Sequence, residues 1–210
     1  MHIIKHRVNN ITDLDIIDTN MGVEIDVRYH NNDLILHHDP FNHHISENVT
    51  LKEFVKTYTK NFTGTIILNI KTEGIEQQCI DIMAECKYTN WFFLDLSMPM
   101  LINYANNLEN LENINSNNLC TRFSEYENIE SVILYQDKVS WVWVDCFHSL
   151  PLTKESFQQI NNSRQKICIV SPELQNHDKS EIYAFKDKIR KNNFIVNAVC
   201  TKHPELWQVS

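Results

Sequence analysis

The feature that most constrains the fold is a regular alternation of short apolar runs with longer, more polar stretches along the 210 residues. The runs are rich in β-branched and aromatic residues, which is typical of buried strands. They comprise residues 3–4, 23–27, 34–36, 65–70, 91–96, 119–123, 141–144, 167–170 and 194–199. Stretches between them carry apolar residues at i, i+3 and i+4 spacing, which predicts helices over 51–58, 75–86, 98–106, 126–135, 153–161 and 179–191. Strands that alternate with helices form a parallel sheet.

The number of strand and helix pairs predicts an α/β fold of the (β/α)8 TIM barrel type. The run 34–36 follows 23–27 through Asn31, Asn32 and Asp33, so we interpret it as a small β-hairpin after the second strand. About eight strand and helix units remain, and 210 residues lie near the lower end of the range of about 200 to 400 for this barrel. We expect one compact domain over residues 1–210. An open, doubly wound sheet is the alternative.

Composition excludes several ways of binding phosphate. The chain has only 3 glycines in 210 residues, whereas about 7% is usual. Phosphate loops and dinucleotide fingerprints use several glycines at once, so neither is present. Any phosphate must therefore be held by side chains or by a metal. The net charge of −8 argues against a partner such as nucleic acid or an anionic membrane, although a local cationic pocket remains compatible with it.

The sequence predicts a cytoplasmic protein. Its first residues contain no apolar signal core, and no stretch reaches the roughly 18 apolar residues of a membrane span. The six cysteines form no CxxC pair, which favours reduced, buried thiols over a disulfide framework. The sequence makes no prediction about oligomeric state.

Polar side chains gather where the predicted strands end. In a parallel barrel the carboxyl ends of the strands build the active site, so these residues are the candidates for chemistry. They are His6, Arg7, Glu24, Asp26, Arg28, His37, His38, Asp39, Asn69, Lys71, Asp95, Arg122, Asp145, Glu173, Lys202 and His203.

Glu24 and Asp26 lie two residues apart, so on a strand their side chains point the same way. Two carboxylates that converge inside a barrel repel each other unless a cation or a proton neutralises them. Oxygen ligands suit Mg²⁺ or Ca²⁺ better than Zn²⁺. The equally weighted alternative is a structural cluster in which each carboxylate pairs with a base such as Arg7 or Lys71.

His6 and His38 end different strands near these carboxylates. Two imidazoles that face one pocket can act as general base and general acid near neutral pH. Arg7 and Lys71 add fixed positive charge, which could bind a phosphate diester and stabilise charge on its oxygens.

A second metal hypothesis comes from the histidine cluster around the segment HHDPFNHH. His37, His38, His43 and His44 could form a zinc site, but the segment lacks a helical HExxH frame. We therefore rank a zinc-dependent hydrolase that uses these histidines below a protein that binds Mg²⁺ or Ca²⁺ through carboxylate oxygens.

The order of these motifs resembles the glycerophosphodiester phosphodiesterase family, a TIM barrel related to phosphatidylinositol-specific phospholipase C. The resemblance rests on His6-Arg7, Glu24-x-Asp26, His38-Asp39 and Lys71 after a Leu-Asn-Ile run, and it continues in residues 171–174 and 200–204. The resemblance implies that His6 and His38 are the acid and base, and that Arg7 and Lys71 contact phosphate. It also implies that Glu24 and Asp26 bind Mg²⁺ or Ca²⁺.

The chain also departs from the family pattern. Asn69 stands where the family has an acidic metal ligand, and its amide oxygen can ligate a hard cation without adding charge. A further carboxylate could compensate, with Asp95, Asp145 and Glu173 as candidates. Other departures are Val8 after His6-Arg7, Lys202 in the last motif, and a short segment between Asp39 and Leu51.

Two functions follow from this resemblance and these departures. The first is a metal-dependent phosphodiesterase that hydrolyses a small glycerol-phosphate or sugar-phosphate diester. The second, motivated by Asn69, is a catalytically silent or weakly active barrel that binds a phosphorylated polyol or sugar.

Overall fold

The computed structural model describes residues 1–40 and 49–208, and its chain divides into two compact units. We call residues 6–115 the N-terminal unit, and residues 1–5 with 116–210 the C-terminal unit. The organisation of residues 1–210 as one domain stays a prediction.

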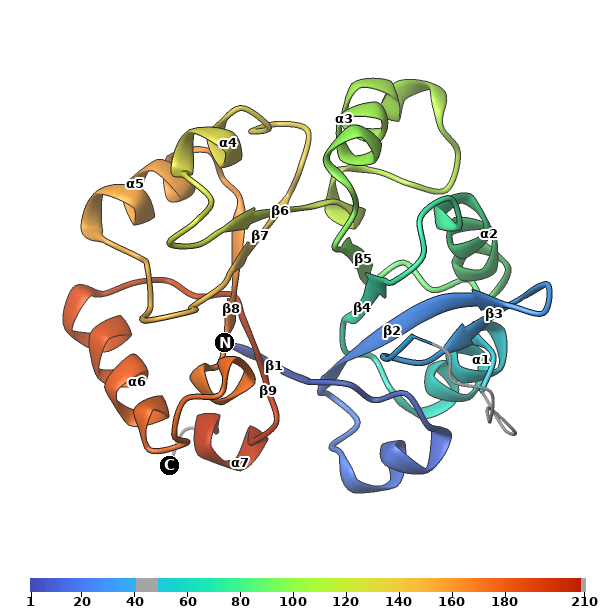
Figure 1. Cartoon of the computed structure of the whole chain (residues 1–210), viewed down its shortest axis with the longest axis horizontal. Helices are drawn as coiled ribbons and strands as arrows, with labels where there is room; N and C mark the ends of the chain where they lie inside the picture. Colours follow the sequence, from blue (N-terminus) through green and yellow to red (C-terminus); the bar gives the residue numbers. More distant parts are fainter. Residues whose placement is uncertain (41–48, 209–210) are drawn as a thin grey trace. The chain divides into compact units, whose positions relative to one another are not determined.

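The N-terminal unit contains three parallel strands in the order β5-β4-β2, with β3 antiparallel to β2. These strands are β2 (Gly22–His30), β3 (Asp33–Leu36), β4 (Ile66–Ile70) and β5 (Trp91–Leu94). Its helices are α1 (Leu51–Asn61), α2 (Glu76–Glu85) and α3 (Met98–Asn107), which connect or follow the strands (Figure 1). The antiparallel β2–β3 pair confirms the predicted hairpin.

The C-terminal unit contains five parallel strands in the order β1-β9-β8-β7-β6. They are β1 (His2–Lys5), β6 (Cys120–Phe123), β7 (Trp141–Val144), β8 (Lys166–Val170) and β9 (Ala198–Thr201). The helices are α4 (Ile129–Ile133), α5 (Lys154–Asn162), α6 (Glu181–Asn192) and α7 (Pro204–Trp207).

The strand pairing confirms the (β/α)8 barrel and excludes the doubly wound alternative. His2 is in register with Ala198 and Lys5 with Thr201, so the first and last strands of the chain are parallel neighbours. A barrel requires this pairing of first and last strands, whereas an open doubly wound sheet does not. Between β1 and β2 the chain forms a 3-10 helix, Ile11–Ile16, and no α-helix.

Among the predicted elements whose bounds differ from the observed ones, two differ for a clear local reason. The last strand was predicted over 194–199 but spans Ala198–Thr201, because α6 ends at a left-handed Asn193 and Phe194 packs against Phe157 before pairing begins. The helix predicted over 126–135 is shorter, because the Asn128 side chain accepts a hydrogen bond from Ser131 N and caps the helix there.

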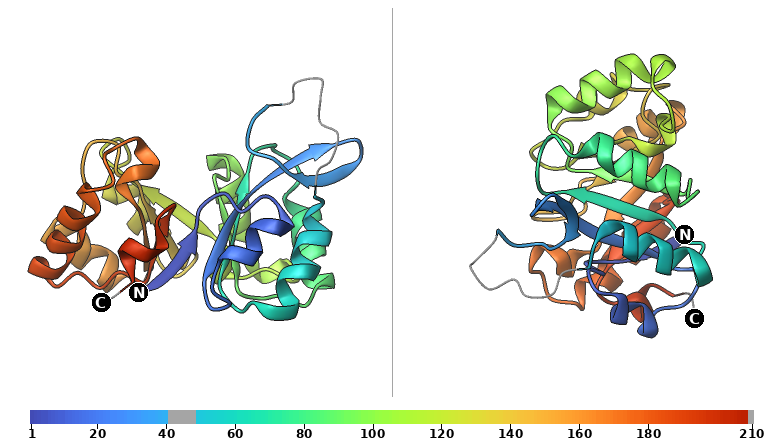
Figure 2. Two further views of the ribbon diagram at one scale, coloured as in Figure 1. Left: turned by 90° about the horizontal axis from the view of Figure 1, so that it is seen from below. Right: turned by 90° about the vertical axis from the view of Figure 1, so that its right-hand side faces the viewer.

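The β2–β3 hairpin extends beyond the end of β4. β2 pairs with β4 over residues 23–27 and with β3 over residues 27–30, so the hairpin extends beyond Ile70, the last residue of β4 (Figure 2). His37 N then donates to Asp26 O at 2.9 Å. The segment after β3 therefore lies beside the middle of β2, where the two predicted metal-binding carboxylates are.

Helix α1 illustrates how apolar residues at helical spacing become the buried face of a helix. Thr50 caps the helix by accepting a hydrogen bond from Glu53 N, and the buried residues Leu51, Phe54, Val55 and Tyr58 follow helical spacing.

The cysteines Cys79, Cys120, Cys146, Cys168 and Cys200 are buried free thiols, as predicted, and Cys86 is half-buried. Within residues 1–40 and 49–208, no helix is long and apolar enough to cross a membrane.

Gly64 sits where two backbone segments meet. A β-carbon on Gly64 would overlap the carbonyl group of Met21 and lie 2.5 Å from Gly22 N, at the start of β2. Next to this contact, Val23 N donates to Thr65 O at 2.9 Å and the Tyr58 hydroxyl donates to Met21 O at 2.8 Å. This contact helps to hold β2 in register with β4.

We therefore predict that Gly64→Ala destabilises the protein by about 1–3 kcal/mol or more, because backbone must move to admit the methyl group. Thr63→Ala is the matched control, since Thr63 is exposed and uses its backbone groups for its contacts with Thr19 and Asn90. Urea unfolding of both variants tests this. Equal midpoints for Gly64→Ala and the wild type would contradict it.

Candidate active site

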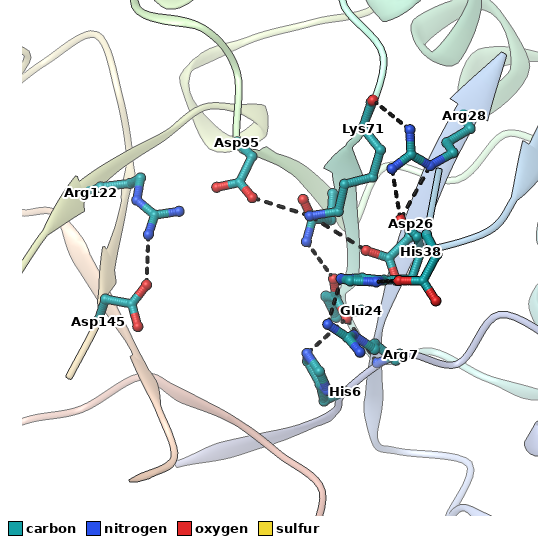
Figure 3. Close-up of polar contacts among 12 residues, drawn as sticks. His6, Arg7, Glu24, Asp26, Arg28, His38, Lys71, Asp95, Arg122 and Asp145 are labelled. Atoms are coloured by element: carbon teal, nitrogen blue, oxygen red, sulfur yellow. Dashed lines mark hydrogen bonds and ion pairs between the residues drawn. The ribbon is translucent and has the colours of Figure 1, made fainter. Parts of the chain in front are cut away.

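The seven residues predicted for the site all lie in the N-terminal unit, and the structure brings them together (Figure 3). They come from the segment after β1, from β2, from the segment after β3, and from the end of β4. These residues are His6, Arg7, Glu24, Asp26, His38, Asn69 and Lys71, of which Figure 3 labels all but Asn69.

Glu24 and Asp26 are buried charges on one side of β2. Their exposed fractions are 1% and 0%, and Asn69 on the neighbouring strand is 7% exposed. Asp26 and Asn69 are in register across β2 and β4, so their side chains share a face of the sheet. Burial of a carboxylate is costly unless it is paired or protonated, so the surroundings of both decide what the site can do.

Each Glu24 oxygen has a partner. Arg7 N donates to Oε2 and Asn69 Nδ2 donates to Oε1, both at 2.8 Å, while His6 Nε2 lies 3.8 Å from Oε2. Burial, and then repulsion from Asp26, raise the pKa of Glu24 to about 7, although the two hydrogen bonds lower it. Near neutral pH the Glu24 carboxyl is thus divided between its protonated and charged forms.

Asp26 is held by a residue that sequence reasoning missed. Asn9 Nδ2 donates to Asp26 Oδ2 and Asp26 N donates to Asn9 Oδ1, both at 2.9 Å. Lys71 Nζ lies 3.6 Å from the other oxygen, Oδ1, which accepts no hydrogen bond. No spacing rule identifies Asn9, because its contact depends on the path of the loop after β1.

Arg7 connects Glu24 to His38. It adopts a left-handed conformation with φ 54°, which allows its N–H to reach Glu24 while its guanidinium reaches His38 Nε2. Because arginine only donates, His38 Nε2 is an acceptor. The His38 proton therefore lies on Nδ1, which donates to Asp39 Oδ1 at 2.7 Å. This hydrogen bond lowers the pKa of the Asp39 carboxyl.

Lys71 bridges Asp26 to Asp95, whose Oδ2 lies 3.4 Å from Nζ. Asp95 follows β5 and also has a left-handed conformation, with φ 61°. Of the three carboxylates considered as a further metal ligand, Asp95 is the one in the same unit as Glu24. Its contact with Lys71 makes it a partner of the ammonium group.

The other two carboxylates, Asp145 and Glu173, take part in hydrogen-bond networks of the C-terminal unit. Asp145 accepts from Arg122 Nη2 and Gln175 Nε2, both at 2.6 Å. Glu173 accepts from the Thr201 hydroxyl at 2.6 Å and from Lys202 N at 2.9 Å. For the zinc hypothesis, His43 and His44 lie outside the described residues.

The donor set of the site fits a hard cation. Among the described residues, no group of three His, Cys, Asp or Glu side chains could hold a metal, and the third candidate ligand in this site is the Asn69 amide. Yet Asp26 Oδ1 and Asn69 Oδ1 are buried oxygens without a hydrogen bond. Such oxygens are ligands that Mg²⁺ and Ca²⁺ prefer, so Glu24, Asp26 and Asn69 could hold one of them.

Comparison with known proteins shows the fold. No protein-family model matches the chain, and no curated protein matches it. Among solved structures, a glycerophosphodiester phosphodiesterase from Agrobacterium tumefaciens is similar with a TM-score of 0.67 and 11% identity, over 99% of this chain and 98% of that one. A glycerophosphoryl diester phosphodiesterase from Parabacteroides distasonis has a TM-score of 0.69 and 13% identity, over 98% and 84%.

The same fold also occurs with another activity. A tryptophan synthase α-subunit from Pyrococcus furiosus is similar with a TM-score of 0.55 and 11% identity, over 95% of this chain and 86% of that one. The comparisons confirm the resemblance to the phosphodiesterases at the level of the fold. The function must be argued from the site, because one barrel supports many reactions.

The raised pKa of Glu24 predicts a pH dependence of stability in cation-free buffer. Folding favours the protonated carboxyl, so its stabilising effect is complete below about pH 4.5 and is lost as pH rises through about 7. Over this window the loss approaches about 1.4 kcal/mol per pH unit. Glu24→Gln removes this contribution.

Urea unfolding of the wild type and of Glu24→Gln from pH 5 to 8, with a chelator present, measures the effect. We expect the free energy of unfolding of the wild type, relative to that of the variant, to decrease with pH. A difference that stays constant across this range would contradict the assignment.

Proposed function

We propose that the protein is a phosphoric diester hydrolase that acts on a small glycerol-phosphate or sugar-phosphate diester. The observation that carries the proposal is the contact of Arg7 with both Glu24 and His38. It joins a buried carboxylate pair, a cationic group and an imidazole in one unit. This combination is suited to binding a phosphate and transferring protons beside it.

Arg7 and Lys71 are the proposed phosphate contacts. Arginine presents a planar set of donors that matches phosphate oxygens, and lysine adds a point charge. Lys71 is 19% exposed at its side chain, so it is accessible while remaining close to Asp26. The positive charge of both would stabilise charge that develops on the phosphate oxygens.

His38 and His6 are the proposed base and acid. With its proton on Nδ1, His38 has a lone pair on Nε2 that can accept a proton once substrate replaces the Arg7 contact. In a substrate with a neighbouring hydroxyl, that oxygen would bond to phosphorus as its proton moves to His38. The bond to the leaving alcohol would break as His6 donates a proton to its oxygen, and water would later open the cyclic phosphate.

Glu24, Asp26 and Asn69 are the proposed ligands of a divalent cation, Mg²⁺ or Ca²⁺. A bound cation would polarise the phosphate and neutralise its charge. The Asn69 amide nitrogen donates to Glu24, and its oxygen, which accepts no hydrogen bond, is the atom that would ligate the cation. A small-molecule substrate and a cytoplasmic location remain predictions of the sequence.

The amide at Asn69 also supports a second candidate function, a barrel that binds a phosphorylated polyol or sugar without turning it over. An amide in place of a carboxylate removes one negative charge from the cation site, which weakens cation binding. Both functions use the same pocket, so measurements on the wild type and on Asn69 variants separate them.

We predict that His38→Ala and His6→Ala each lower kcat on the glycerol-phosphate diester of ethanol by about 10²–10⁴-fold, since its neighbouring hydroxyl must lose a proton and its leaving alkoxide must gain one. His148→Ala, an exposed histidine of the C-terminal unit, is the control and should retain wild-type kcat. Steady-state assays with added Mg²⁺, Ca²⁺ or Mn²⁺ measure this. Full activity in either site variant would exclude the proposed mechanism.

Asn69→Asp should tighten binding of Mg²⁺ or Ca²⁺ by about tenfold or more, because a third carboxylate adds charge to the site. Calorimetric titration measures the Kd, and Asn106→Asp adds the same charge at an exposed position as a control. If the wild type is an enzyme, it already cleaves the diester. If turnover occurs in Asn69→Asp and not in the wild type, the silent barrel is correct.

A further inference from the structure

Arg28 joins the segments that carry two of the proposed functional residues. It lies on β2, two residues after Asp26. Its Nε and Nη2 donate to His38 O at 3.2 and 2.8 Å, and its Nη1 donates to Lys71 O at 3.1 Å (Figure 3). One half-buried guanidinium therefore binds the backbone of the segments after β3 and after β4.

Both carbonyls lie where their segments leave the sheet. β3 ends at Leu36 and β4 at Ile70, so His38 and Lys71 are past the regular strand pairing. On the other side, Lys71 N donates to Val27 O at 3.0 Å. Arg28 thus supplies donors to carbonyls that strand pairing no longer satisfies, which matters because a buried carbonyl without a partner is costly.

The chemistry of the contact requires arginine. A guanidinium holds its donors in a rigid plane and can bind two acceptors on different segments at once. A lysine ammonium is a point donor on a flexible stem and cannot keep the same two-sided geometry. One donor on each of the three guanidinium nitrogens already binds a backbone oxygen, which favours a role in holding the chain over direct contact with substrate.

We propose that Arg28 is a positioning residue that fixes the His38 imidazole and the Lys71 ammonium relative to each other. This inference rests on the proposed function for its kinetic consequence only. His38 would accept the proton and Lys71 would bind the phosphate, so the distance between the two groups decides whether a bound diester meets the base. Small errors in such positions cost rate steeply.

The test compares wild type, Arg28→Lys and Arg28→Met, with Arg164→Lys as an exposed, charge-conserving control. Nuclear magnetic resonance of the His38 ring nitrogens and hydrogen exchange at the Lys71 amide report positioning without any substrate. We expect Arg28→Lys to shift the His38 signals and to speed exchange at Lys71 by about tenfold, with larger effects in Arg28→Met.

A positioning role predicts that these changes stay local. Unchanged His38 signals and Lys71 exchange in Arg28→Met would overturn the proposal. It would also be overturned if Arg28→Lys accelerated exchange equally across the N-terminal unit, since this would indicate general destabilisation.

The kinetic arm uses the same glycerol-phosphate diester of ethanol. Arg28→Lys should lower kcat by about 10- to 100-fold, and the same substitution in the His38→Ala background should have a much smaller effect because the two act through one group. Additive effects would contradict the proposal. If the wild type cleaves no diester, the proposed function fails, while the resonance and exchange measurements still decide the role of Arg28.

Discussion

The burial of Glu24 and Asp26 on the same side of one strand is the constraint on which the site depends. Two carboxyl groups removed from water repel each other and lose solvation, so each oxygen needs compensation from nearby. The chain supplies it with the Arg7 backbone, the Asn69 and Asn9 amides and the Lys71 ammonium. These groups come from strands and loops far apart in sequence. The barrel topology is what brings them within reach.

The sequence predicted the regular parts of this arrangement well. Strand alternation and the hairpin after β2 follow from period-two patterns and turn residues, which are local properties of the chain. The position of β9 was less predictable, because Phe194 and Val196 are buried by packing before the strand begins at Ala198. Apolar composition shows that a segment is buried, but pairing depends on where the neighbouring strand starts.

The site residues likewise divide into those that a local sequence pattern indicates and those that only the fold brings together. Candidates at strand ends could be grouped from the sequence because parallel strands end on one side of a barrel. Asn9 could not, since a loop amide binds Asp26 only through the path of the chain after β1. Likewise, nothing in the letters around Arg7 indicates its left-handed backbone. Long-range contacts of this kind appear only once the fold places the segments side by side.

The scarcity of glycine has a consequence at the left-handed positions. Most chains would place glycine there because it adopts positive φ without strain. Here Arg7 and Asp95 occupy two such positions at strand ends, so the residues that bend the backbone also carry the charges of the site. At these two positions, relief of the backbone strain by glycine would therefore remove a charged side chain. Selection for stability alone would favour glycine at both positions and would remove two charges of the candidate site, so backbone stability and charge are in conflict within single residues.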